Sequence, residues 1–166
     1  MSTTQKLYPF KLNLPVHTIK FNVENFIISH SKLIQRKNNF KELPIEISTE
    51  TNNVPFATNY GDRIVFYITP IKYIISLFET RVAMKTWLVL LIIHEYAHSL
   101  DKFVNSKDNE YTRNTLINKY ARFILKRDYV HFSIFAIKKE YYRWGKNTHP
   151  AIWDCLSFGA INDENW

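Results

Sequence analysis

The chain has 166 residues, of which 46% are hydrophobic and 16% aromatic, enough apolar material for the core of a single domain spanning residues 1–166. It contains only three glycines and a single cysteine, Cys155. Glycine-rich phosphate loops are therefore disfavoured, and an intramolecular disulfide or a multi-cysteine zinc cluster is excluded. The formal net charge of +7 favours an acidic partner, such as nucleic acid, an anionic membrane surface or an acidic protein.

The first residues, MSTTQKLYPFKLNLP, are polar and interrupted by proline, and they contain no apolar signal-peptide core. The longest apolar run, Trp87 to Ile93, is far too short to span a bilayer. Because the lone cysteine is also typical of a reducing compartment, we expect a soluble cytoplasmic protein with no transmembrane segment.

Apolar residues recur at helical spacing over residues 22–37, which predicts a helix with Asn22 as its cap. His30 lies on the apolar face of this helix, where a histidine is more often packed into the core than used as a ligand.

Two strands are predicted next. Residues 43–49 alternate between apolar and polar side chains, and residues 63–69 are rich in β-branched and aromatic residues. Gly61 and Asp62 form the expected turn before the second strand. A helix is predicted to follow over residues 71–78.

The rest of the chain is predicted to be helical. Residues 81–103 lack proline and glycine and are apolar around their middle, so we expect a helix buried on nearly all sides. Asp108 is a plausible cap for a helix over residues 109–127, and a further helix is expected over 131–145. Pro150 opens a last short helix. The predicted fold class is α+β: a compact domain with a small β-sheet packed on the buried helix and a helical C-terminal half.

The buried helix carries the motif His94-Glu95-x-x-His98. Two histidines four residues apart leave the same helix face, where both nitrogens can bind one Zn²⁺ at ~2 Å each. Glu95 points ~100° away and can reach a water on the metal, where it would act as general base for attack on a carbonyl. The flanking residues are uncharged, and an apolar helix has no other inexpensive reason to bury two imidazoles and a carboxylate. The motif therefore predicts a zinc site.

The chain here resembles the HExxH zinc peptidases, or zincins, and most strongly a compact gluzincin domain of the HtpX-like or SprT-like kind. The resemblance covers residues 52–69 and 88–98, where an Asn-x-Phe-Ala stretch is partly matched by Pro55-Phe56-Ala57. In zincins the strand before the active-site helix lies along the cleft and pairs with extended substrate. The resemblance thus implies a protein or peptide substrate bound by strand addition to Arg63, Ile64, Val65, Phe66, Tyr67 and Ile68.

The third zinc ligand is left open between several acids. Glu110 is the first choice, because Glu110 and Asn114 match the Glu-x-x-x-Asn/Asp spacing of glutamate zincins, in which the later residue supports a ligand histidine. Two departures weigh against it: the separation from His98 is short, and Arg113 replaces the usual small residue. Glu140 is the alternative.

Other polar residues near the motif have less certain roles. His149 and Asp154 are the remaining ligand candidates. Asp101 is expected either to orient a ligand histidine or to lie on the surface at the helix end. An oxyanion could be stabilised by any of several side chains, between which the sequence does not choose: Tyr111, Tyr141, Tyr142, Arg143 or His149.

Three functions remain in competition. The first is a zinc-dependent endopeptidase with Glu95 as general base. The second is a basic, non-catalytic module with a zincin-like fold that binds nucleic acid or protein, with strongly salt-dependent binding and no metal requirement. The third is a relic whose metal is only structural, against which the intact Glu95 argues.

Overall fold

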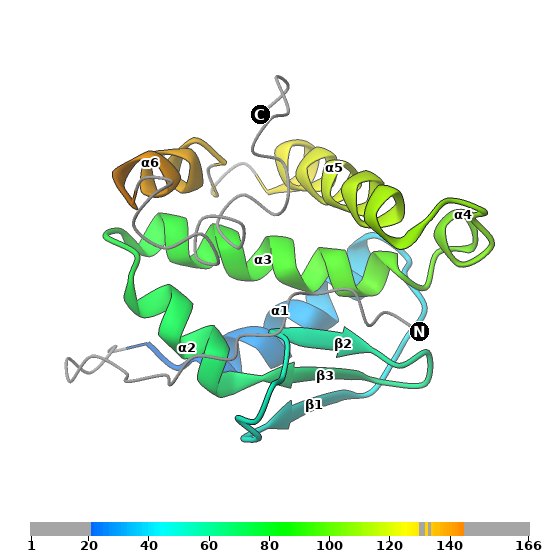
Figure 1. The fold of residues 1–166 in the computed structure, drawn as a ribbon, viewed down its shortest axis with the longest axis horizontal. Helices are drawn as coiled ribbons and strands as arrows, with labels where there is room; N and C mark the ends of the chain where they lie inside the picture. The colour runs from blue at the N-terminus through cyan, green and yellow to red at the C-terminus, as the bar shows by residue number, and fades with distance from the viewer. Residues whose placement is uncertain (1–20, 130–131, 133, 145–166) are drawn as a thin grey trace.

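The computed structural model describes residues 21–129, 132 and 134–144. These residues form an α+β domain, as predicted (Figure 1). The elements in chain order are α1 (Val23–Lys37), β1 (Ile45–Ser48), β2 (Ala57–Asn59), β3 (Ile64–Tyr67), α2 (Ile68–Ser76), α3 (Arg81–Ala97), α4 (Asp101–Val104), α5 (Glu110–Asp128) and α6 (Ile134–Trp144).

The sheet has the strand order β1-β3-β2. β3 pairs in parallel with β1, where Ile64 lies opposite Ile45, and antiparallel with β2, where Phe66 lies opposite Ala57. β2 was not predicted, because its three residues are too few to show the alternation of apolar and polar side chains that marks a strand. The predicted Gly61 turn is confirmed: Gly61 has φ +91, which only glycine adopts without strain, and the turn joins β2 to β3.

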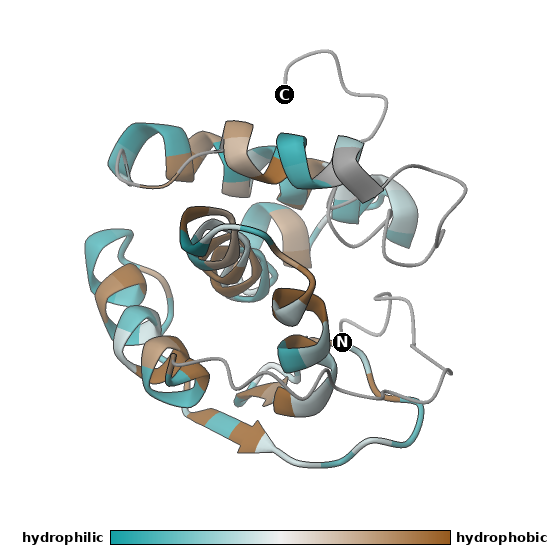
Figure 2. Ribbon diagram, turned by 90° about the vertical axis from the view of Figure 1, so that its left-hand side faces the viewer, coloured by the Kyte–Doolittle hydropathy of each residue, from teal (hydrophilic) through white to brown (hydrophobic). Residues whose placement is uncertain are grey.

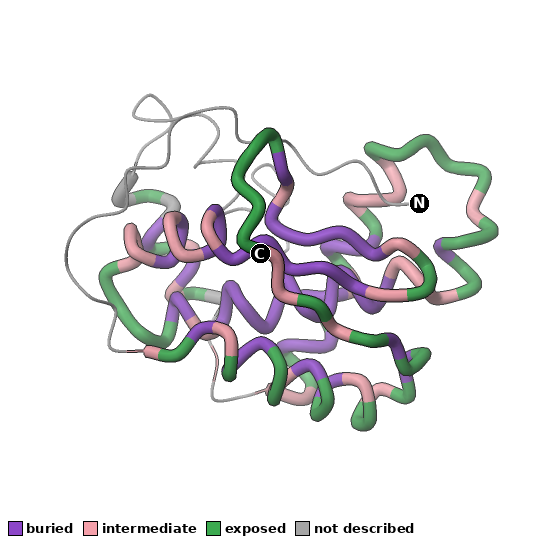
Figure 3. Tube along the Cα trace, turned by 90° about the horizontal axis from the view of Figure 1, so that it is seen from below, coloured by how far each residue is buried: buried purple, intermediate pink, exposed green. Residues whose placement is uncertain are grey.

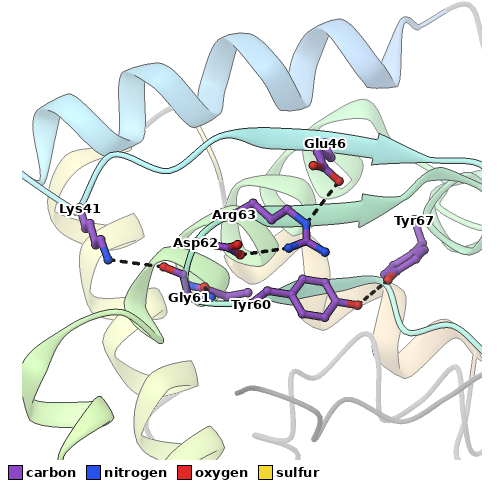
Figure 4. A network of polar contacts seen from close by, with 8 residues as sticks. Lys41, Glu46, Tyr60, Gly61, Asp62, Arg63 and Tyr67 are labelled. Carbon is purple, nitrogen blue, oxygen red and sulfur yellow. Dashed lines mark hydrogen bonds and ion pairs between the residues drawn. The ribbon is translucent and has the colours of Figure 1, made fainter.

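The two faces of β3 meet different surroundings. Ile64 and Phe66 belong to the main core, whereas Val65 and Tyr67 form a small cluster with Val54 on the other face. On that face the Tyr60 and Tyr67 hydroxyls are 3.0 Å apart (Figure 4). Burial, followed by the hydrogen bond to Tyr60, raises the pKa of Tyr67 to about 12, so the Tyr67 hydroxyl stays protonated and its contact with Tyr60 helps to fix the outer face of the sheet.

The same face carries a chain of charged contacts that ends at the β2–β3 turn. The Arg63 guanidinium lies 3.5 Å from a Glu46 oxygen and 3.0 Å from an Asp62 oxygen, and it stacks over the Tyr60 ring (Figure 4). The Lys41 ammonium donates to the Gly61 carbonyl at 3.4 Å. These contacts hold the turn between β2 and β3 against β1.

α3 is the central element of the molecule and contacts α1, α5, α6 and β2. Figure 2 looks along α3 and shows its apolar ribbon enclosed by the other elements, and Figure 3 shows it as a buried run. Trp87 has no exposed surface and makes an edge-to-face contact with Phe56, whose ring lies 4.9 Å away, just before β2. A helix with apolar side chains on every side must be covered on every side, and this requirement organises the fold.

α3 ends earlier than predicted. The helix stops at Ala97, His98 forms its C-cap, and Leu100 is extended with φ −70 and ψ 137 before the short α4 begins. The prediction of one helix to residue 103 was wrong because Ser, Leu and Asp permit either conformation locally. The consequence is that His98 lies at the very end of the buried helix.

The remaining predictions have mixed outcomes. Asn22 caps α1 as predicted, accepting from the Asn25 amide at 3.0 Å. His30 stacks on Phe26 with ring centroids 3.8 Å apart, so it packs as expected. The cap of α5 is Asn109 and not Asp108, because the Asn109 side chain accepts from the Thr112 amide at 2.8 Å.

Two further points concern the limits of the described chain. The short helix predicted after Pro150 lies outside the described residues. Among the helices that the structure describes, each is too short or too polar to cross a lipid bilayer.

Candidate metal centre

The last turn of α3 brings two imidazole rings together. The Nε2 atoms of His94 and His98 are 3.1 Å apart, and the ring planes are inclined by 73°. Two nitrogens bound to one tetrahedral Zn²⁺ at ~2.05 Å would be separated by roughly 3.3 Å. The rings therefore converge on one point, as the helical spacing predicts.

Asn118 of α5 orients the first of these rings. Its Oδ1 accepts a hydrogen bond from His94 Nδ1 at 2.7 Å, and both residues are buried. A carbonyl oxygen can only accept, so the proton of His94 resides on Nδ1 and the lone pair of Nε2 points toward His98. This is the tautomer that a metal-binding histidine needs.

For His94, the supporting role predicted for Asn114 is filled by Asn118. Asn114 lies at an intermediate depth on α5, one turn before Asn118, and lines a neighbouring pocket instead. The two asparagines are four residues apart and share the face of α5 that meets the end of α3.

Burial lowers the pKa of both histidines. The pKa of His94 falls to about 4, mainly through desolvation of the charged form, with the Asn118 hydrogen bond opposing the shift. The pKa of His98 falls to about 2 through burial, with further lowering by His94 and Arg113. Both rings are consequently neutral at physiological pH, which is the form that binds a metal ion.

Glu95 lies between the two histidines in the sequence and is fully buried. Its backbone carbonyl accepts from Asn59 Nδ2 at 2.8 Å, and the same amide nitrogen donates to Ser99 Oγ at 2.8 Å. The Oδ1 of Asn59 in turn accepts from the Gly61 amide at 2.8 Å. Asn59 thus fastens β2 and its turn to the end of α3.

The role of Asn59 was not predicted from the sequence. The only available signal was an asparagine two residues before a Gly-Asp turn, which is also the ordinary composition of a loop. Its role depends on β2 lying beside α3, and that arrangement was not predicted.

A pocket of about 410 Å³ opens beside His98, between the β2–β3 turn, α4 and the start of α5. Its walls include His98, Glu110, Asp101 and Asn114. Glu110 and Asp101 are both exposed, Glu110 in the first turn of α5 and Asp101 at the start of α4. The structure therefore brings three of the predicted site residues to the same pocket as His98, with Asp101 and Glu110 exposed at its rim and the Asn114 Oδ1 buried.

Glu140, the alternative third ligand, is placed elsewhere. It is buried in α6, and its Oε1 accepts a hydrogen bond from the Glu79 amide at 2.6 Å, just before α3 begins. Glu79 and His94 are separated by nearly the whole of α3, which corresponds to ~20 Å at 1.5 Å per residue. Glu140 is a structural residue of the opposite helix end, and its assignment as a ligand was wrong.

The substrate strand also requires correction. The resemblance placed an added peptide strand along Arg63 to Ile68, but β3 is the central strand, and its two edges pair with β1 and β2. A strand with both edges paired has no backbone groups left for a peptide. Ile68 already belongs to α2. The strand next to the end of α3 is β2, at the edge of the described sheet.

The other candidates are dispersed or not described. Tyr111 and Tyr142 are 79% and 66% exposed on α5 and α6, so neither packs against the histidine pair. The side chains of Tyr141 and Arg143, and the residues His149 and Asp154, lie outside the part that the structure describes.

The described residues supply part of the ligand set that a metal ion needs. Within residues 21–129, 132 and 134–144, no three His, Cys, Asp or Glu side chains come together as a complete ligand set. Two neutral imidazoles with converging Nε2 atoms, one of them fixed by Asn118, nevertheless match two of the three protein ligands that a catalytic zinc site requires.

Comparisons of the chain with protein-family models, curated proteins and solved structures found no match.

Proposed function

We propose that the chain is a zinc-dependent endopeptidase that hydrolyses peptide bonds with Glu95 as general base. The observation that carries the proposal is the convergence of His94 and His98 Nε2 at 3.1 Å on a buried helix, with a carboxylate next to the first histidine. In the metal-free chain His98 Nε2–H can donate to His94 Nε2 at this separation, and release of that proton leaves both lone pairs facing the point that an ion at ~2 Å from each nitrogen would occupy.

Each residue of the centre has a distinct task. His94 and His98 hold the ion, and Asn118 keeps His94 in the binding tautomer through its 2.7 Å hydrogen bond. When bound, zinc supplies acidification of water and polarisation of a carbonyl group. Glu95 accepts the proton of the attacking water and passes it to the leaving amine, as a carboxylate in a water-poor site can do. The pocket beside His98 provides space for the polypeptide next to the reacting bond.

The third ligand is assigned by experiment among three residues. Glu110 remains a candidate because it lines the pocket of His98 with an exposed side chain. His149 and Asp154 are the others. Zinc affinity measured for Glu110→Gln, His149→Ala and Asp154→Asn should fall sharply in one variant only, and Glu140→Gln serves as the matched control with unchanged affinity.

The proposal is tested by metal analysis and peptide cleavage on protein purified without a histidine tag. We expect about one zinc per chain. Zinc should be lost in His94→Ala, and it should be retained in Glu95→Gln while cleavage of a mixture of internally quenched peptides stops. A folded protein that takes up no zinc would overturn the proposal, and zinc binding without any cleavage in the wild type would favour the non-catalytic alternative.

A further inference from the structure

The two faces of α5 differ in chemistry. The inner face packs on α3 through buried residues such as Ile117, Asn118 and Ala121. The outer face presents Lys119, Phe123 and Arg127, spaced four residues apart and all exposed, so that they form one line along the helix. Phe123 is 58% exposed, so its ring is largely open to solvent between the two cations.

Two lysines from distant parts of the sequence extend this line. The Lys102 ammonium of α4 lies 4.3 Å from the centre of the Tyr120 ring, and the Lys37 ammonium of α1 donates to the Asp128 carbonyl at 3.2 Å. Together Lys37, Lys102, Lys119, Phe123 and Arg127 form a surface that we call the basic–aromatic face. Three helices contribute to it, which is why no single segment of the sequence shows a concentrated basic stripe.

The charge of this face is strongly one-sided. α5 contains only two acidic residues, Glu110 at its start and Asp128 at its end. Asp128 is already paired with Arg127 at 2.7 Å, and this pair lowers the pKa of Asp128. Arg127 also lies over the Phe123 ring, 5.4 Å from its centre. The face therefore offers three further cations, Lys37, Lys102 and Lys119, and an exposed ring beside the Arg127–Asp128 ion pair.

We propose that the basic–aromatic face binds single-stranded nucleic acid, with the cations on the phosphates and a base stacked on Phe123. A line of cation, aromatic ring and cation at one-turn spacing extends ~12 Å along the helix, which matches three to four stacked nucleotides at ~3.4 Å each. Base faces are available for stacking only in single strands, so an exposed ring favours these over a duplex.

An anionic membrane is the competing occupant, and the face fits it less well. Membrane association through an amphipathic helix needs a broad apolar face, whereas the outer side of α5 exposes only Leu116 and Phe123 among its larger apolar residues beyond the first turn. The inner apolar face of α5 is already covered by α3.

The test is fluorescence anisotropy with the full chain and a labelled deoxythymidine oligomer of about 20 nucleotides, with an oligouridine of the same length in parallel. We expect affinity to fall steeply between about 50 and 200 mM salt. Phe123→Leu, which keeps an apolar side chain but removes the ring, should weaken binding by about 5- to 100-fold. Replacing Lys102 and Lys119 by alanine should reduce the slope of log affinity against log salt by about 1.4, from ~0.7 per phosphate contact.

Matched controls come from the exposed face of α1. Lys32→Ala with Arg36→Ala removes two exposed cations elsewhere, and Leu33→Ala truncates a side chain that is 56% exposed. Neither control should change affinity by more than about twofold. His94→Ala should bind the oligomers as the wild type does, so failure of the zinc proposal leaves this one intact.

Three results would overturn the proposal. They are the absence of binding to both oligomers at low salt, equal loss in the control variants, and attachment to phosphatidylserine vesicles without binding to the oligomers. A preference for oligouridine or deoxythymidine would identify RNA or DNA as the ligand and supports the proposal in either case.

Discussion

The two ends of α3 each bury a glutamate, and their surroundings differ. At the start, Glu140 of α6 accepts from the Glu79 amide at 2.6 Å, and the Thr80 hydroxyl accepts from the Ala83 amide at 3.2 Å. At the other end, Glu95 is buried within the last turn, beside two neutral histidines. The first carboxylate accepts from an amide just before the N-cap Thr80, next to the positive end of the helix dipole.

The helix dipole stabilises a buried carboxylate at the start of a helix and destabilises one at its end. The start of a helix is equivalent to a partial positive charge and favours a carboxylate, while its end favours a cation, each by roughly 0.3–1 kcal/mol at exposed sites and more when buried. Glu140 is therefore explained by the fold alone. A buried Glu95 with His94 and His98 at the negative end is the arrangement that a bound cation stabilises, so position along the helix separates a structural acid from a catalytic candidate.

Zinc affinity should show the largest difference between variants at the two ends of α3. His94→Ala or His98→Ala should reduce it far beyond the ~10–100-fold that follows loss of a residue which only orients a ligand. Glu140→Gln at the opposite end should leave zinc affinity unchanged. Competition with a chelating dye measures both, and circular dichroism confirms that the variants are folded. Equal zinc binding by His94→Ala and the wild type would remove the distinction between the two ends.

A second consequence is acid sensitivity of the metal-free protein. The pKa of His94 is about 4 in the folded chain and about 6.5 in the unfolded chain, so only the unfolded state takes up a proton as the pH falls between these values. The contribution of His94 to the free energy of unfolding is fully present above pH ~6.5 and falls by about 3 kcal/mol as the pH is lowered to ~4. His98 changes the free energy of unfolding in the same direction. Urea denaturation with chelator present should show this decline.

His94→Asn is the control for the acid effect. It retains a polar side chain without a titrating ring, so its free energy of unfolding should decline less steeply over the same pH interval. Carboxylates that titrate at lower pH are common to both proteins and cancel in the difference. Parallel curves for the two proteins would show that His94 is not held neutral by burial.

The third prediction separates the two asparagines of α5. Asn118→Ala removes the acceptor of the His94 Nδ1 proton and should weaken zinc binding by about 10–100-fold. Asn114→Ala, one turn earlier, should weaken it by no more than a few-fold because Asn118, and not Asn114, accepts the Nδ1 proton of His94. The reverse order would restore the assignment that the sequence pattern favoured.

Local sequence signals predicted most elements and the centre of the site. The apolar periodicity of α1 and α3 follows from burial on one face or all faces, and the spacing of His94 and His98 places both rings on one face of any helix. Both signals can be found within one segment of the sequence and do not depend on contacts with distant segments. The α+β class and the Gly61 turn were predictable for the same reason.

The contacts that failed prediction are those made between distant segments. Asn118 lies 24 positions after His94, and Asn59 reaches α3 from 36 positions before Glu95. Choosing Asn118 over Asn114, or recognising β2 as the strand beside α3, requires the packing of α5 and the sheet against α3. Glu140 was proposed because it borders an apolar face and its distance in sequence from His98 suits a glutamate zincin, but the packing of α6 places it at the start of α3.

The smallest expected effect is on stability at the start of α3. Glu140→Gln keeps an oxygen that can accept from the Glu79 amide but removes the charge, and hydrogen bonds to charged groups exceed neutral ones by about 1 kcal/mol. The free energy of unfolding from urea titration should fall by about that amount, while Glu110→Gln, at an exposed position, should change it by less than about 0.5 kcal/mol. A larger loss in Glu110→Gln would mean that the exposed acid of α5, and not the buried one of α6, supports the fold.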